Sequence, residues 1–293
     1  MEQVNKCINC DCQDFTSVFS LKDYFYTEET FTIQQCAKCG LRITNPRPNE
    51  KALGAYYKTE NYLSHSDRNE SLFDKFYHFI RKYNLNYKRD IIEKFHTSGR
   101  IIDIGCGTGA FLGQFDKSKW IRQGFEPDAE TREIAKETYG IDVNDTSVLN
   151  NLVDTKAEVI TLWHVLEHIS LINEQLEKIK SLLTDNGILV IAVPMSNSHD
   201  ANYYGKYWAA YDAPRHLYHF TKDTLEQLLS KHGFTLVQKY PMRFDAFYIS
   251  LLSEKYKKSS FPLLRALAQG LSSNLAAKTE KGTYSSMIFV FRQ

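Results

Sequence analysis

A buried strand that runs directly into a glycine-rich turn constrains the fold of this chain more than any other feature. Residues 100–104 read Arg-Ile-Ile-Asp-Ile, and glycines follow at positions 105, 107 and 109. Glycine permits tight turns, which let a backbone and a helix N-terminus approach a ligand closely. The sequence therefore predicts a ligand-binding turn at one end of a buried strand.

Strands and helices alternate from residue 99 onward. Such alternation predicts an α/β fold, with a parallel sheet that carries helices on both faces. One or two amphipathic helices are also expected between residues 246 and 277. Strands are expected at 100–104, 120–126, 159–163, 188–193, 234–239 and 286–291. Helices are expected at 110–118, 172–183 and 221–232, with a further helix that ends at 139, and a turn is expected at 185–187.

The N-terminal segment carries two Cys-x-x-Cys pairs, Cys7/Cys10 and Cys36/Cys39. Four thiolates suffice for a closed tetrahedral zinc site, although an iron–sulfur cluster or four unliganded cysteines would have the same spacing. A unit of this size has little core of its own, so a metal would supply folding energy. Two prolines at 46 and 48 set its boundary, and residues 1–48 are predicted to form a cysteine-rich zinc module.

Residues 49–98 form a second predicted unit. Apolar and aromatic residues recur there at helical spacing, so one or two helices should link the module to a domain at residues 99–293. These helices are interpreted either as a lid or as plain packing elements.

Two carboxylates flank the glycine turn. Glu126 lies 21 residues after Gly105 at the end of the next predicted strand, where a doubly wound fold places the acid that binds ribose hydroxyls. Gly105-x-Gly107-x-x-Ala110 also fits a dinucleotide-binding dehydrogenase, but that pattern alone is weak. Asp103, inside the strand, could instead meet the ammonium group of an amino-acid ligand.

Taken together, the motifs resemble those of class I S-adenosylmethionine-dependent methyltransferases. The resemblance rests on Asp-Ile-Gly-Cys-Gly-Thr-Gly at 103–109 and on residues 163–168 and 182–189. Residues 1–240 are similar to a bacterial subgroup with an N-terminal cysteine module, which sugar C-methyltransferases share. The resemblance implies a doubly wound, Rossmann-like sheet with a small zinc-ribbon-like module, and S-adenosylmethionine and structural zinc as cofactors.

The resemblance also implies roles for individual residues. Asp103 and the glycine turn would surround the methionine part of the cofactor, and Glu126 would take the ribose hydroxyls. Pro127 would lie near the adenine, and Trp163 and His164 would line the sulfonium side. The implied cofactor-binding residues are Asp103, Gly105, Cys106, Gly107, Thr108, Gly109, Glu126, Pro127, Trp163 and His164.

Methyl transfer from a sulfonium requires alignment of the nucleophile and, where needed, removal of its proton, a task that suits histidine. His216 and His219 lie in the sequence Asp-Ala-Pro-Arg-His-Leu-Tyr-His at 212–219. We interpret His216 as the general base, with His219 and His164 as further catalytic candidates. A structural hydrogen-bond network is the alternative, and Arg215 could bind a substrate carboxylate or phosphate.

His164, Glu167 and His168 form a His-x-x-Glu-His pattern. An inverted zinc-protease motif needs a helix and another acidic ligand, whereas this pattern follows a strand. Some quinone-pathway O-methyltransferases hold a divalent metal with a similar cluster, which could acidify a catechol-like hydroxyl. The ordinary interpretation is a helix cap. Aromatic residues at 203–211 should line either an acceptor pocket or the core.

Composition bears on the protein's partners and on its location. The 36 basic and 35 acidic residues nearly cancel, which argues against a nucleic-acid partner. No apolar run could span a bilayer and the start lacks the apolar core of a signal peptide, so a cytoplasmic location is expected.

The sequence therefore predicts methylation of an oxygen or carbon of a small-molecule acceptor, with a sugar or a quinone- or phenol-like compound as candidates. An RNA methyltransferase that uses the zinc module to bind nucleic acid is one alternative. A non-catalytic binding protein with a vestigial pocket is another. Nothing in the sequence indicates the oligomeric state.

Overall fold

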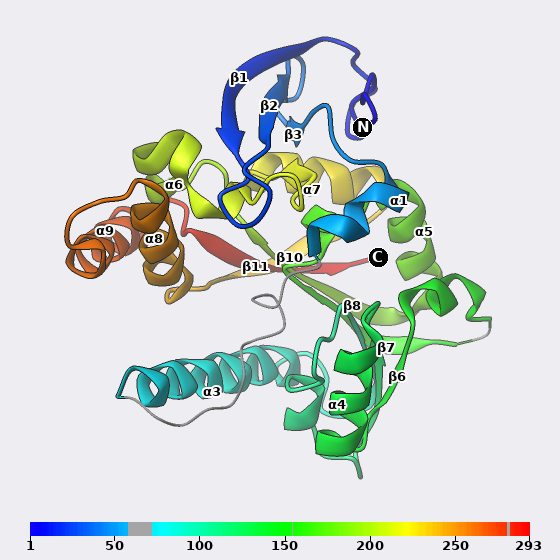
Figure 1. Ribbon diagram of the computed structural model, residues 1–293. Helices are drawn as coiled ribbons and strands as arrows, with labels where there is room; N and C mark the ends of the chain where they lie inside the picture. Colours follow the sequence, from blue (N-terminus) through cyan, green and yellow to red (C-terminus); the bar gives the residue numbers. More distant parts are fainter. Residues whose placement is uncertain (58–71, 154, 280–281) are drawn as a thin grey trace.

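The computed structural model describes residues 1–57, 72–153, 155–279 and 282–293 (Figure 1). It contains two β-sheets. The larger has seven strands in the order β10-β11-β8-β7-β4-β5-β6, and the smaller has four in the order β1-β2-β3-β9. The larger sheet comprises β4 (Gly99–Ile104), β5 (Trp120–Phe125), β6 (Asp142–Asn144), β7 (Ala157–Trp163), β8 (Leu183–Pro194), β10 (Thr235–Pro241) and β11 (Ser286–Arg292).

The strands β4 to β8 of the larger sheet run parallel, and β11 lies antiparallel between β8 and β10. Alternate residues face opposite sides, as the two-residue period of a strand requires. Leu189 and Ile191 of β8 join one core cluster, whereas Ile188 and Val190 join the other. Both faces are therefore buried, and the predicted α/β architecture with helices on both faces is confirmed.

Helices from different parts of the chain cover the two faces. Apolar residues of α5 (Ile172–Leu182) and α7 (Lys222–Lys231) belong to the first cluster, and Ile91 and Ile92 of α3 (Leu72–Glu93) belong to the second. The helix α4 (Ala129–Tyr139) begins at Asp128, whose carboxylate accepts the Thr131 amide, and ends at Gly140 in the left-handed region.

Two local expectations were wrong. The helix expected at 110–118 is reduced to a 3-10 turn, η2 (Leu112–Gln114). The Asp116 carboxylate accepts the Ser118 amide and hydroxyl, a local turn that competes with a helix. The turn expected at 185–187 lies inside β8, where the register against β7 shifts between the pairs Ala157↔Leu183 and Val159↔Ile188.

The smaller sheet joins the N-terminus to a distant part of the chain. Its antiparallel strands β1 (Phe15–Lys22), β2 (Thr30–Cys36) and β3 (Arg42–Thr44) gain a fourth strand, β9 (Tyr218–His219). Ile43 and Tyr218 share a core cluster with the larger sheet. The division into residues 1–48, 49–98 and 99–293 stays a prediction.

The remaining elements connect the sheets or gather at one end of the molecule. At that end, α8 and α9 pack on each other and against α6 (Figure 1). Within the described residues, every helix is too short or too polar to cross a membrane. These elements are α1 (Glu50–Leu53), η1 (Gly54–Tyr57), η3 (Thr146–Asn151), η4 (Leu166–His168), α6 (His199–Tyr204), η5 (Gly205–Tyr207), η6 (Ala209–Tyr211), α8 (Asp245–Tyr256) and α9 (Pro262–Ala276).

Candidate active site

The glycine turn lies at the carboxyl end of β4, beside the ends of β5 and β7. Gly105 has a φ of +70°, and a Cβ there would lie 2.5 Å from Cγ2 of Val165. At Gly107, with a φ of +53°, a Cβ would meet no described atom within 4 Å. The turn is therefore closely packed at its first glycine and open at its second. Thr108 is half-buried.

Cys106 differs from its neighbours in the turn. Its thiol is buried against Gly124 of the adjacent strand, where a Cβ would lie 2.6 Å from the Cys106 sulfur. Burial raises the pKa of this thiol. The Cys106 side chain therefore packs the turn onto the sheet. Only the backbone of Cys106 is left to contact a ligand bound at the turn.

Glu126 is tied to the glycine turn by its carboxylate. One oxygen accepts the Gly107 amide at 3.1 Å and the other accepts the Asp128 amide at 3.1 Å. Burial raises the pKa of Glu126. A carboxylate offers about four lone-pair directions, so Glu126 keeps acceptor capacity for a ligand's hydroxyls.

Arg132 holds the chain that follows Glu126. Its guanidinium donates to the carbonyls of Glu126 and Pro127 at 2.7 Å each, and to the Asp145 carboxylate at 3.1 Å. Pro127 itself is exposed. No motif in the sequence indicates this arginine, because its partners are mainly backbone oxygens.

Asp103 is fully buried in β4 beside the turn. Thr161 of β7 donates its hydroxyl to the Asp103 carboxylate at 2.6 Å. Burial raises the pKa of Asp103 to about 7, against the opposing effects of Thr161 and Lys88. A ligand cation at this place would favour the ionised carboxylate.

Lys88 and Asp245 are two site residues that the sequence did not reveal. The Lys88 amine lies 4.4 Å from the centre of the Trp163 ring, and burial lowers its pKa while Asp245 and Asp103 oppose that shift. Asp245 lies in the first turn of α8, with an oxygen 3.3 Å from Nε2 of His164. Both residues reach the site from helices that carry no motif.

His164 lies between two carboxylates. Its backbone has a φ of +57°, and its ring contacts Asp245 on one side and Glu167 on the other, with Nδ1 3.6 Å from a Glu167 oxygen. Although burial opposes protonation, Asp245 and Glu167 raise the pKa of His164 to about 9. At neutral pH the ring is therefore cationic, which suits ion pairing better than proton removal.

Glu167 is fully buried, with 1% of its surface exposed. Neither of its oxygens has a hydrogen-bond partner among the described residues. One oxygen lies 4.0 Å from Nε2 of His216, and the ring of His168 packs at right angles to that of His216 at 4.5 Å. Glu167, His168 and His216 bring ligand-type atoms within 4.8 Å of one another, as a bound cation would require.

Backbone carbonyls orient both histidines of this cluster. Nδ1 of His216 donates to the Ala210 carbonyl at 2.8 Å, which leaves Nε2 facing Glu167. Nδ1 of His168 lies 3.1 Å from the Arg215 carbonyl and 2.8 Å from the Tyr57 hydroxyl. Burial, together with His216, lowers the pKa of His168 to about 4.

His219 lies apart from this cluster, in β9. Its Nε2 is 3.0 Å from the Thr44 hydroxyl, which in turn donates to the His216 carbonyl at 2.7 Å. Burial holds the pKa of His219 well below its usual value, with His216 and Arg42 acting in the same direction. Of the three histidines predicted to be catalytic, His164 and His216 lie beside Glu167. His219 contacts His216 through the Thr44 hydroxyl.

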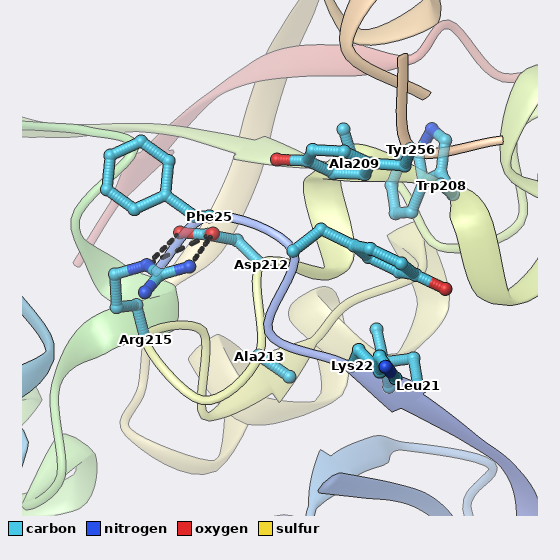
Figure 2. Close-up of a pocket in the computed structure, with 10 residues that line it drawn as sticks. Leu21, Lys22, Phe25, Trp208, Ala209, Asp212, Ala213, Arg215 and Tyr256 are labelled. Carbon is cyan, nitrogen blue, oxygen red and sulfur yellow. Dashed lines mark hydrogen bonds and ion pairs between the residues drawn. The ribbon is translucent and has the colours of Figure 1, made fainter. Parts of the chain in front are cut away.

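Arg215 has a different environment from the one that was expected. It is fully buried, and its guanidinium donates to the carboxylates of Asp23 and Asp212 and to the Tyr56 carbonyl. Figure 2 shows this guanidinium turned toward Asp212 with the Phe25 ring beside it. The idea that Arg215 binds a substrate anion is therefore wrong, because its donors are used within the protein.

The aromatic run at 203–211 mainly fills the core. Trp208 donates to Asp200 at 2.7 Å, and the Tyr211 hydroxyl accepts from Arg42 at 3.0 Å. A separate cavity of about 290 Å³ lies between α3 and the start of α8. Its lining is aromatic and cationic: Tyr83, Asn84, Tyr87, Lys94, Tyr240, Pro241, Met242, Arg243 and Phe244.

The four paired cysteines converge at the N-terminal sheet. The sulfurs of Cys7 and Cys39, and those of Cys10 and Cys36, are each 3.5 Å apart, and all four lie within 4.8 Å. Four sulfurs about 2.3 Å from one zinc ion would lie about 3.8 Å apart, so the geometry fits zinc. Against burial, backbone amides lower the pKa of Cys36 to about 7. Cys12 contacts Asp14 instead.

Comparison with known protein families identifies a methyltransferase domain in this chain. The family described as "Methyltransferase domain" matches residues 76–239, more than half of the chain. Among curated proteins no sequence matches.

Solved structures share the fold at low sequence identity. Magnesium protoporphyrin IX methyltransferase from Synechocystis PCC 6803 with bound SAM is 13% identical, with a TM-score of 0.51 over 85% of this chain and 100% of that one. A SAM-dependent methyltransferase from Archaeoglobus fulgidus is 18% identical, with a TM-score of 0.50 over 76% and 100%. The chain belongs to the methyltransferase domain family, as an enzyme of the class I, S-adenosylmethionine-dependent type.

Proposed function

We propose that this enzyme transfers the methyl group of S-adenosylmethionine to an oxygen or carbon of a small-molecule acceptor, with His216 as the general base. The observation that carries the proposal is the buried Glu167 carboxylate, which lies between His164 and His216. Nε2 of His216 would take the acceptor's proton. The imidazolium formed would then be stabilised by Glu167, because opposite charges attract strongly in a poorly solvated site.

The cofactor would bind along the ends of β4, β5 and β7. In this proposal the Asp103 carboxylate meets the ammonium group, the turn at 105–109 approaches the methionine part, and Glu126 takes the ribose hydroxyls. Pro127 would lie at the adenine, with Trp163 and His164 on the sulfonium side. The positive charge of His164 is offset there by Glu167 and Asp245, so it need not repel the sulfonium.

The cavity between α3 and α8 has a volume near the lower end for small-molecule sites, but Glu167 and His216 are not among the residues that line it. Its tyrosines and cations would suit a flat, oxygen-bearing compound such as a phenol or quinone, and a sugar is the other candidate. The Synechocystis enzyme acts on a small molecule according to its name. An RNA substrate is less well supported, because the formal net charge is only +1.

A structural zinc ion is proposed at Cys7, Cys10, Cys36 and Cys39, whose sulfur separations suit a tetrahedral site. The ion would hold the two cysteine turns together and so stabilise the sheet that receives β9. His219 would then position His216 through Thr44, rather than act on the acceptor.

Metal-assisted methyl transfer is a second candidate. It is favoured by the Glu167 oxygens, which lack hydrogen-bond partners in the described part of the chain, and by one ring nitrogen each of His168 and His216 within 4.8 Å of a Glu167 oxygen. A divalent cation held by Glu167, His168 and His216 would lower the pKa of a bound hydroxyl. His216 would then be a ligand and not a base.

Calorimetric titration with S-adenosylmethionine, and with NAD as control, tests the cofactor. We expect micromolar binding of the first alone, weakened in Asp103→Ala and Glu126→Ala. Binding of NAD instead would contradict the proposal. A screen of phenols, quinones and sugars with methyl-labelled cofactor, with and without EDTA, would then separate the two mechanisms, because only the metal-assisted reaction needs the cation. Binding without transfer to any acceptor would favour a non-catalytic protein.

A further inference from the structure

The helix α9 packs with its apolar face outward. Its buried positions are small or polar, namely Ala266, Gln269, Gly270 and Ser273. Five leucines of the same helix are exposed: Leu263 at 51%, Leu264 at 66%, Leu267 at 48%, Leu271 at 55% and Leu275 at 54%. This is the reverse of the usual surface helix, whose apolar stripe faces the core.

Specific contacts fix this orientation. A Cβ on Gly270 would lie 2.5 Å from the Phe247 ring, so only glycine allows α9 to approach α8 this closely. Ser273 donates to the buried Asp200 carboxylate at 2.8 Å, and the Gln269 amide lies 3.1 Å from His199. Rotation of α9 to bury its leucines would break these contacts, so the exposure of the leucines is built into the packing.

The leucines form one continuous stripe. At 100° per residue they span an arc of about 120° on the helix surface. Phe261, with 73% of its surface exposed, extends the stripe beyond the helix N-terminus. Monomeric proteins rarely expose a large contiguous apolar patch unless another surface covers it.

The charge of the segment that contains the stripe has one sign. Residues 255–279 contain no acidic residue. Their cations are exposed and lie at the end of α8, in the turn that follows it, on α9 and just after α9: Lys255, Lys257, Lys258, Arg265 and Lys278. An apolar stripe bordered by lysine and arginine suits a surface with an apolar interior and anionic groups at its boundary.

We propose that α9 docks on an anionic lipid membrane, with its leucines among the acyl chains and its cations at the headgroups. Figure 1 shows α9 at the outer edge of the molecule, next to α8. A second copy of the chain fits this face less well. Pairing of two copies through the leucines would bring their cations together, with no acidic residue in this segment to balance them.

Co-sedimentation of the whole protein with lipid vesicles tests the proposal, with vesicles of phosphatidylcholine alone or of phosphatidylcholine and phosphatidylglycerol at three to one. We expect binding to the mixed vesicles that weakens as salt rises. The double variant Leu267→Glu, Leu271→Glu should lose at least about tenfold in affinity, and removal of one cation, as in Arg265→Gln, about fivefold.

Ile134→Glu is the control for a single added charge, because Ile134 is exposed on α4, away from α9, and takes the same change in charge as Leu267→Glu alone. It should bind mixed vesicles like the unchanged protein. Three results would overturn the proposal: no binding to mixed vesicles, equal loss in Ile134→Glu and the leucine variant, or a dimer in ultracentrifugation that Leu267→Glu dissociates. The last would assign the stripe to a second copy. All of these outcomes are independent of methyl transfer.

Discussion

The two sides of the candidate active site are constructed in different ways. On the cofactor side, Asp103, the glycine turn and Glu126 are close in sequence, and backbone amides hold the Glu126 carboxylate. On the acceptor side, Asp23 and Arg215 are 192 residues apart, and they meet through a buried ion pair. Local backbone geometry thus determines one side, and long-range packing determines the other.

This contrast implies different sensitivities. Backbone amides remain in place when a side chain changes, so the cofactor side should tolerate substitutions outside its own motif. The acceptor side depends on side chains from the N-terminal sheet, the end of β7 and the loop before β9, and a change in any of them should alter it. The predictions below test that difference, from the largest expected effect to the smallest.

Loss of the proposed zinc should produce the largest difference between the acceptor side and the cofactor side. In the double variant Cys36→Ser, Cys39→Ser the N-terminal sheet loses the metal's folding energy, and with it the partners of Arg215 and His219. We expect methyl transfer to fall more than about a hundredfold, while cofactor affinity in calorimetry changes less than about threefold. Parallel loss of both would mean that the two sides fold as one unit. Cys12→Ser is the control.

His216→Ala should reduce kcat by about 10²- to 10⁴-fold, the usual contribution of a general base. His219→Gln, which keeps a donor for Thr44, should lose less than about tenfold, because it only positions His216. Steady-state kinetics and the pH profile of kcat provide the measurement. An equal loss in both variants, with unchanged profiles, would contradict the assignment of the base.

Arg215→Leu should lower the free energy of unfolding by about 3–5 kcal/mol, because the buried Asp23 and the half-buried Asp212 would both lose their partner. The matched variant on the cofactor side, Arg132→Leu, breaks a more exposed pair with Asp145 and should cost about 1 kcal/mol or less. Urea denaturation of both proteins measures the difference. Equal losses would remove the contrast between the two sides.

Cofactor affinity should depend on pH through Asp103. Burial raises its pKa to about 7, so below that pH the carboxyl is protonated and must lose its proton to pair with the cofactor's ammonium. We therefore expect affinity to rise about tenfold from pH 5.5 to 7, where an α-amino group stays protonated. Titration calorimetry at several pH values checks this. Asp103→Asn should bind weakly and without this dependence.

The smallest expected effect belongs to Lys88. Its amine opposes the upward shift of the Asp103 pKa, so Lys88→Met should move the midpoint of the pH dependence upward by less than about one unit. The same titrations measure the midpoint. An unchanged midpoint would show that the Lys88 charge does not act on Asp103, and a downward shift would contradict the expected sign. Lys94→Met, just after the same helix, serves as control.

The contrast also explains what the sequence could predict. The glycine turn, Asp103 and Glu126 could be proposed from the sequence, because the pattern of a strand followed by a turn lies in adjacent residues. The cysteine cluster was found from its spacing. Lys88 and Asp245 gave no signal, since an ordinary lysine and aspartate become site residues only through the packing of α3 and α8.

Arg215 shows the limit of local interpretation. Its loop is rich in charged and aromatic residues, which favoured a substrate contact, but its partner Asp23 lies in a short turn with no recognisable motif. The prediction of a helix at 110–118 was wrong for a similar reason. The spacing of apolar residues carries no information about the competing turn at Asp116.

The pairing of β3 with β9 also affects the order in which the protein can be made. The first three strands leave the ribosome early, but their fourth strand, Tyr218–His219, is translated only after the whole ligand-binding turn and most of the larger sheet. At about 5–20 residues per second, the N-terminal sheet waits roughly 10–35 s with an unpaired edge. During synthesis the cysteine turns would therefore be the main constraint on this segment, and the acceptor side would form only after β9 has been translated.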